Sequence, residues 1–183
     1  MSHDRSSNVT DQRQDLLRLL HHAHGSARKV GQLLKRLIGR HAVHDILAAP
    51  IESFLTQTLD QQRLLLECIS RIGDGEVSSG SLKESFTVMH HCASDRPVYD
   101  VLHDVALART LTLEDIDLYS SVIVTAESGG FFETRHVCEG ILLEKSSMAD
   151  WLSRTAAVHA VHIGSRMKHA APSRSNESAL AET

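Results

Sequence analysis

Asp115 and Glu144 are the two residues of this sequence whose type and spacing best suit chemistry in a buried site. Each interrupts a stripe of apolar residues that recurs every three to four positions, which is the spacing of one helix face. Both lie 14.5 residues from the midpoint between Gly129 and Gly130 (129.5 − 115 and 144 − 129.5). In an antiparallel hairpin that turns there, both carboxylates would reach one level of the core, about 22 Å from the turn.

Two carboxylates that face each other in a core must share a proton, find hydrogen-bond donors or bind a cation. Some four-helix bundles hold two metal ions in this way, with carboxylates from every helix and histidines from two of them. The sequence therefore raises the hypothesis of an iron or manganese site at Asp115 and Glu144.

The first half of the chain does not supply the remaining ligands of such a site. For a helical turn near residue 42 or 43, the matching level falls on Ala27 and Gln57. Their inward neighbours are Arg28, Phe54 and Gln61, and none of these five residues is a carboxylate or a histidine. We therefore expect a vestigial polar layer, hydrogen-bonded through Tyr119, Gln57 or Arg28. A single weakly bound metal at Asp115 and Glu144 is the alternative.

Other acidic residues near these positions fit a solvated surface. Glu114 and Asp117 lie to the side of the stripe that contains Asp115, so we expect water around them. The Glu-x-x-His pattern of Glu133 and His136 lies more than two turns from Glu144, where no other carboxylate faces the core. We interpret it as a surface pair and not as a ligand pair.

Bulk composition excludes several classes of function. The chain has 183 residues, enough for one domain with its own core, and a net charge of −4, which gives no basic footprint for nucleic acid. No apolar run reaches 18 residues, and the polar N-terminus lacks the apolar segment of a signal peptide. The three cysteines are widely spaced among apolar neighbours. They indicate core residues of a reduced, cytoplasmic protein.

The periodicity of apolar residues predicts an all-α four-helix bundle. Aromatic residues make up only 4% of the chain, and aliphatic residues recur at helical spacing in four long segments. The predicted helices cover residues 11–40, 43–72, 98–127 and 131–162, and a loop over 73–81 precedes a short extra helix over 82–92. This short helix lies in the crossover between the two helical hairpins. We expect residues 11–164 to form the bundle, and residues 1–10 and 165–183 to be disordered.

Four stretches of the sequence resemble one known family. They are FLTQTLDQQRLLLECI (54–69), GSLKESFTVM (80–89), LEDIDLYSSVIVTAESGG (113–130) and LLEKSSMADWL (142–152). Together they resemble the YciE/YciF-type ferritin-like family of bacterial stress proteins over roughly residues 22 to 155. The resemblance implies a ferritin-like bundle, a homodimer and a di-metal site.

The resemblance also shows where this chain departs from the family's metal ligands. The family's first-helix glutamate falls on Ala27, its second-helix histidine on Phe54 and the glutamate after it on Gln57. The third-helix glutamate falls on Asp115, and Tyr119 is retained. In the fourth helix the first glutamate is kept as Glu144, while the second becomes Lys145.

These observations lead to one functional hypothesis and one alternative. The hypothesis is a non-enzymatic ferritin-like protein, associated with stress or with protein interactions, that has lost most of a di-metal site and needs no cofactor. We expect a cytoplasmic homodimer that binds neither nucleic acid nor membrane. The alternative is a metal-binding protein or metal-dependent oxidoreductase that uses iron or manganese at Asp115 and Glu144.

Overall fold

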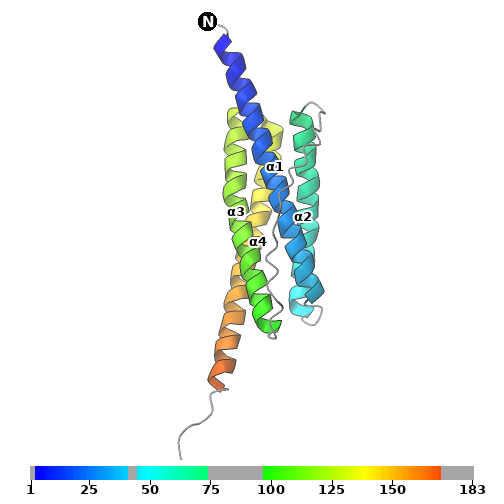
Figure 1. Cartoon of the computed structure of the whole chain (residues 1–183), viewed down its shortest axis with the longest axis vertical. Coiled ribbons are helices and arrows are strands. Elements are labelled where there is room, and N and C mark those ends of the chain that lie inside the picture. The colour runs from blue at the N-terminus through cyan, green and yellow to red at the C-terminus, as the bar shows by residue number, and fades with distance from the viewer. Residues whose placement is uncertain (1–2, 41–44, 74–96, 170–183) are drawn as a thin grey trace, which may run out of the picture.

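The chain folds into long antiparallel helices, as the sequence predicts. The computed structural model describes residues 3–40, 45–73 and 97–169, which form α1 (His3–Arg40), α2 (Asp45–Ile72), α3 (Pro97–Ser128) and α4 (Phe132–His169). In Figure 1, α1 and α4 run in one direction and α2 and α3 in the other. The all-α four-helix bundle is thereby confirmed. The predicted short helix over 82–92 and nearly all of the loop over 73–81 lie outside the described residues.

The outer ends of α1 and α4 extend further than the sequence predicts. Residues 3–10 and 165–169 are helical, whereas the expectation was disorder before residue 11 and after residue 164. The sequence of these ends lacks the apolar periodicity from which the four helices were predicted. The ends continue helices that are already nucleated, which adds one hydrogen bond per residue. Figure 1 shows the two ends projecting beyond the bundle at opposite sides.

Every helix buries residues at alternating three- and four-residue spacing. The apolar face of α1 consists of Leu16, Leu20, Ala23, Ala27, Val30, Leu34 and Leu37. The equivalent face of α3 consists of Val105, Ala108, Thr112, Asp115, Tyr119, Val122 and Ala126. That of α4 consists of Thr134, Cys138, Ile141, Lys145, Met148, Leu152 and Thr155. A seven-residue repeat of this kind keeps one face of each helix toward its neighbours.

The buried positions of α3 and α4 are mirror images about Gly130. Asp115 lies fifteen residues before Gly130 and Lys145 fifteen after it (130 − 115 and 145 − 130), and each other buried pair obeys the same rule. Gly130 has a φ of 75°, in the left-handed region that favours glycine. The amides of Gly130 and Phe131 donate to the carbonyls of Glu127 and Ala126, which closes α3 with a Schellman motif.

The buried face of α2 includes polar side chains. Leu59 and Leu66, which belong to the apolar residues that recur at helical spacing in this segment, are 45% and 50% exposed. Thr58 and Gln61 are buried instead. They lie on the same face of the helix as Leu65 and as Ile51 nearer its N-terminus. Burial of Thr58 is tolerated because its hydroxyl donates to the Phe54 carbonyl of its own helix at 2.7 Å.

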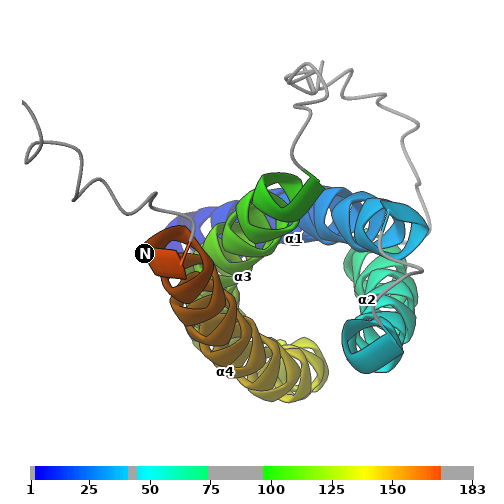
Figure 2. The ribbon, with the colours of Figure 1, turned by 90° about the horizontal axis from the view of Figure 1, so that it is seen from below.

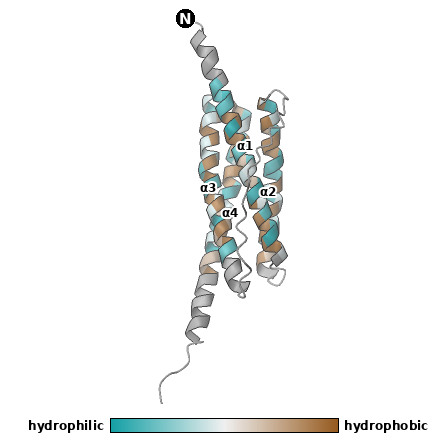
Figure 3. Cartoon of the chain, in the orientation of Figure 1, coloured by the Kyte–Doolittle hydropathy of each residue, from teal (hydrophilic) through white to brown (hydrophobic). Residues whose placement is uncertain are grey.

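The four helices follow one another around a curve in the order α4, α3, α1, α2 (Figure 2). α3 and α4 pack most closely, α1 packs on both α2 and α3, and α2 and α4 touch least. Apolar and polar residues alternate along each helix (Figure 3), as expected for amphipathic helices.

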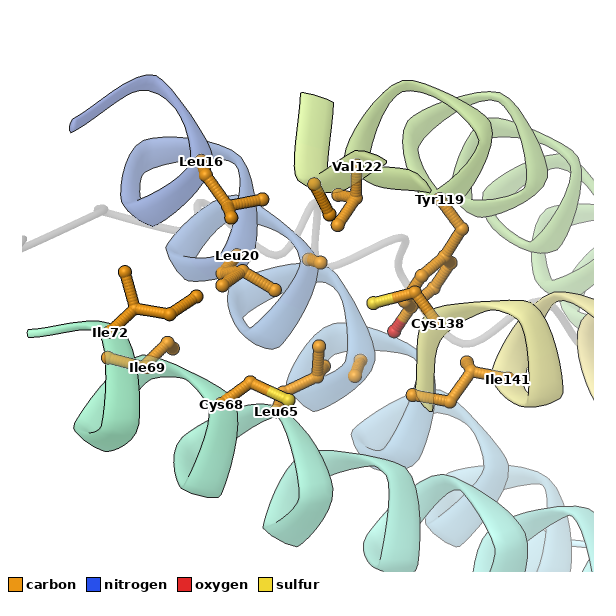
Figure 4. Close-up of a cluster of buried hydrophobic side chains, with 13 residues drawn as sticks. Leu16, Leu20, Leu65, Cys68, Ile69, Ile72, Tyr119, Val122, Cys138 and Ile141 are labelled. Atoms are coloured by element: carbon orange, nitrogen blue, oxygen red, sulfur yellow. The ribbon is translucent and has the colours of Figure 1, made fainter. Parts of the chain in front are cut away.

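The apolar core is divided into two clusters along the bundle. One lies toward the α3–α4 turn and contains Leu20, Leu65, Tyr119 and Cys138 among its members (Figure 4). The other lies toward the opposite end and contains Leu34, Ile51, Ala108, Met148 and Leu152 among its members. The buried charged residues Asp115 and Lys145 lie in the layer between these two apolar clusters.

The observed register predicts opposite effects for two adjacent leucines. Leu65 is fully buried, so Leu65→Ala should lower the free energy of unfolding by about 2–5 kcal/mol, through lost burial and a residual cavity. Leu66→Ala should change it by no more than about 0.5 kcal/mol, because the side chain is half exposed. Urea denaturation followed by circular dichroism measures both. Equal losses for the two variants would contradict the register described for α2.

Candidate functional site

The layer between the two apolar clusters is built around one buried ion pair. Asp115 of α3 and Lys145 of α4 are each 1% exposed, and the Lys145 Nζ lies 2.7 Å from the Asp115 Oδ2. The second carboxylate oxygen, Oδ1, accepts a hydrogen bond from the Ser26 hydroxyl of α1. Both oxygens of this buried carboxylate are therefore satisfied, one by a charge and one by a neutral donor.

Lys145, and not Glu144, is the α4 residue that faces Asp115. The burial of Asp115 confirms its predicted inward position, but Glu144 is exposed and its predicted core position is wrong. The predicted stripe through Glu144 and the observed one through Lys145 share Ile141 and Met148, so apolar spacing alone does not separate them. The position of the α3–α4 turn decides between the two stripes. Because the turn is centred on Gly130, and not between Gly129 and Gly130, residue 145 lies level with residue 115.

Glu144 takes part in the layer from its edge. Its Oε2 accepts a hydrogen bond of 2.7 Å from the Gln61 Nε2 of α2. This bond joins α2 to α4, the two helices that otherwise touch least. The sequence predicts Gln57 at this level, but the buried glutamine is Gln61, which is 3% exposed. The buried positions of α1 and α2 are mirror images about position 44, whereas the prediction assumed position 42 or 43.

The two other predicted hydrogen-bond partners do not fill their expected roles. Arg28 is exposed, on the outer side of α1. Tyr119 is fully buried one turn from Asp115, yet its hydroxyl has no hydrogen-bond partner within the described part of the chain. Burial and the nearby Asp115 carboxylate raise the pKa of Tyr119, so the hydroxyl keeps its proton.

Small side chains on α1 give the layer its shape. Ala27 occupies the α1 position of the layer, and its backbone carbonyl accepts a hydrogen bond of 3.1 Å from the Gln62 Nε2. One turn further, a Cβ on Gly31 would lie 3.2 Å from the same nitrogen. α1 therefore approaches α2 closely at this point, and a side chain at position 31 would press against the Gln62 amide.

The donor set does not fit a di-metal centre. Three of the four oxygens of Asp115 and Glu144 already accept hydrogen bonds from Ser26, Lys145 and Gln61. A metal ion near Asp115 would also face the Lys145 ammonium, which repels it. Over residues 3–40, 45–73 and 97–169, no three His, Cys, Asp or Glu side chains come together as a group that could hold a metal.

The Glu-x-x-His pattern lies on the surface. Glu133 pairs with Arg71 of α2 at 2.6 Å and is 72% exposed, and the His136 side chain is 90% exposed. Glu114 and Asp117 are likewise exposed, as predicted. None of these four residues reaches the buried layer.

Two of the three cysteines behave as core residues. Cys68 and Cys138 are fully buried free thiols in the cluster near the α3–α4 turn, as the sequence predicts, and Cys92 lies outside the described residues. Burial raises the pKa of Cys138 to about 12 and also raises that of Cys68. Both thiols therefore stay protonated near neutral pH and are poor nucleophiles.

Comparisons with known proteins find a matching family and a solved structure with a similar fold. Residues 11–162 match the family described as a domain of unknown function, DUF892. A crystal structure of a protein from Xanthomonas campestris pv. campestris is similar, with a TM-score of 0.70 at 22% sequence identity. The alignment covers 86% of this chain and 99% of that one. No curated protein matches the chain.

The fold and the buried layer define the class of protein: a ferritin-like four-helix bundle with a polar layer across its core. Because the match extends over most of its length, the chain belongs to the DUF892 family. A scan of the described helices for a segment long and apolar enough to cross a membrane finds none.

The ion pair predicts a characteristic pattern in a double-mutant cycle. Lys145→Met leaves the buried Asp115 charge uncompensated and should cost about 3–5 kcal/mol of unfolding free energy. Adding Asp115→Leu should recover most of that loss, because an apolar pair replaces an ion pair at little cost. Denaturant unfolding measures the cycle, with the exposed Asp117→Asn as the control. Additive losses in the double variant would contradict direct pairing.

Proposed function

We propose that this chain is a YciE/YciF-type ferritin-like protein without enzymatic activity, in which an internal ion pair stands in place of the metal centre. The observation that supports this is the Lys145 ammonium, which lies 2.7 Å from the carboxylate that a metal would need. A lysine in that position supplies the positive charge that buried carboxylates require. The protein then needs no cofactor, and the bundle acts as a scaffold for interactions.

The ion pair also explains how the departures from the family's ligands fit together. Where the resemblance implies glutamates, this chain has Ala27 on α1, Gln57 on α2 and Lys145 on α4. Loss of three negative charges and gain of one positive charge turn a strongly acidic centre into a neutral pair at Asp115. Glu144 remains, but it lies at the solvent-exposed edge and bonds to Gln61.

Metal analysis tests this proposal directly. Protein purified without a histidine tag should contain far less than one equivalent of iron or manganese, and Asp115→Ala/Glu144→Ala should not change that content. The matched control is Glu114→Ala/Asp117→Ala, which removes two exposed carboxylates of α3. Stoichiometric iron or manganese that is lost only in the first variant would favour the alternative, a metal-dependent oxidoreductase that uses Asp115 and Glu144.

The stress-associated role, the cytoplasmic location and the homodimer are parts of the same proposal. Large apolar side chains stay exposed on three helices: Leu59, Leu66, Leu107, Leu113, Val124, Phe132, Leu143 and Val158. Leu143 is 71% exposed and Phe132 63%, and their separation of eleven residues (143 − 132) puts both on one face of α4. We assign the dimer contact to this face, because a second copy would cover both side chains.

Sedimentation velocity on the full chain should therefore give a dimer. Leu143→Lys should shift it toward monomer, because a charge in an apolar contact is costly to desolvate. Leu66→Lys, at an exposed leucine of α2, should leave the dimer intact. A monomeric wild-type protein, or a Leu143→Lys variant that stays dimeric, would contradict the assignment.

A further inference from the structure

Within the described part of the chain, two polar side-chain atoms of the core have no hydrogen-bond partner, one in the buried layer and one a helical turn from it. They are the Tyr119 hydroxyl, on a side chain that is fully buried, and the Gln61 Oε1, on a side chain that is 3% exposed. Buried polar atoms of this kind are rare, because each forfeits the hydrogen bonds it made in water. They therefore point to a bound group that the protein itself does not provide.

The surroundings of the two atoms link them to one region. The Gln61 amide nitrogen is held by the Glu144 Oε2 at 2.7 Å, which fixes the direction of its oxygen. The nearby charges of Asp115 and Glu144 both act on the Tyr119 hydroxyl. Figure 4 shows the Tyr119 ring pointing from α3 into the interior, toward the α4 residues Cys138 and Ile141.

The chemistry of the two atoms selects the ligand. A phenol hydroxyl is a donor and an amide oxygen is an acceptor, and water can satisfy either atom because it both accepts and donates hydrogen bonds. The charge of Asp115 is already neutralised by Lys145, and Glu144 is solvent-exposed. A bound cation is therefore not required for charge balance in this layer.

We propose that internal water is a bound component of the layer, accepting the hydrogen bond of the Tyr119 hydroxyl and donating to the Gln61 Oε1. Water of this kind resides at sites that offer it two or more polar partners. It extends the polar layer from the Asp115–Lys145 pair toward α2, where the protein supplies few direct contacts to α4. This assignment does not depend on the proposed function.

Oxygen-17 magnetic relaxation dispersion on the full chain tests the proposal, because it counts long-lived internal water. Tyr119→Phe removes the hydroxyl and keeps the ring, so the count should fall by at least one. The matched control is Thr112→Val on the same helix. The Thr112 hydroxyl is also fully buried, but it donates to the Ala108 carbonyl at 2.7 Å, so its removal should leave the count unchanged.

Urea denaturation of the same variants provides a second readout. A hydroxyl that is truly unpartnered destabilises the fold, so Tyr119→Phe would raise the unfolding midpoint. A hydrated hydroxyl predicts an unchanged or lower midpoint. A raised midpoint, or an unchanged water count in Tyr119→Phe, would overturn the proposal. An anomalous rubidium signal beside Tyr119 in crystals soaked with rubidium chloride would also overturn it, since the ligand would then be a cation.

Discussion

The buried Asp115 carboxylate is the constraint to which the middle of this bundle responds. A charge that is 1% exposed needs a counter-charge and hydrogen-bond donors, and these come from two other helices. Lys145 supplies the charge from α4 and Ser26 a hydroxyl from α1. Because both partners must meet one carboxylate on α3, the axial positions of these three helices are fixed relative to each other.

This constraint agrees with the register that the apolar residues specify. The buried residues of α3 and α4 are reflected about Gly130, and a shift of one residue would separate Asp115 from Lys145. Apolar layers tolerate such shifts more readily, because one leucine contact can replace another. A buried ion pair has few substitutes, so it is suited to selecting one register among several of similar apolar burial.

The sequence was sufficient to predict the helices but not the partners within the site. Apolar periodicity predicted the number of long helices, their inner boundaries and the burial of Asp115. The partner on α4 was missed because the stripes through Glu144 and Lys145 share Ile141 and Met148, and half a residue in the turn decides between them. The Gly129–Gly130 pair signals a turn, but the sequence does not say which glycine takes the positive φ that the structure gives Gly130. Ser26 left no comparable signal, since a serine on a helix most often bonds to its own backbone.

A lysine and a metal ion differ in what they allow a buried carboxylate to do. A metal ion binds reversibly, exchanges ligands and lowers the pKa of bound water, and all three properties allow catalysis. A lysine ammonium satisfies the same carboxylate but is covalently attached, so it cannot dissociate or open a coordination position. In the proposed function, the structural part of a ferritin-like centre is kept and its reactive part is removed. The Asp115–Lys145 pair still favours one register of α3 and α4, and it does so without a coordination position for redox chemistry.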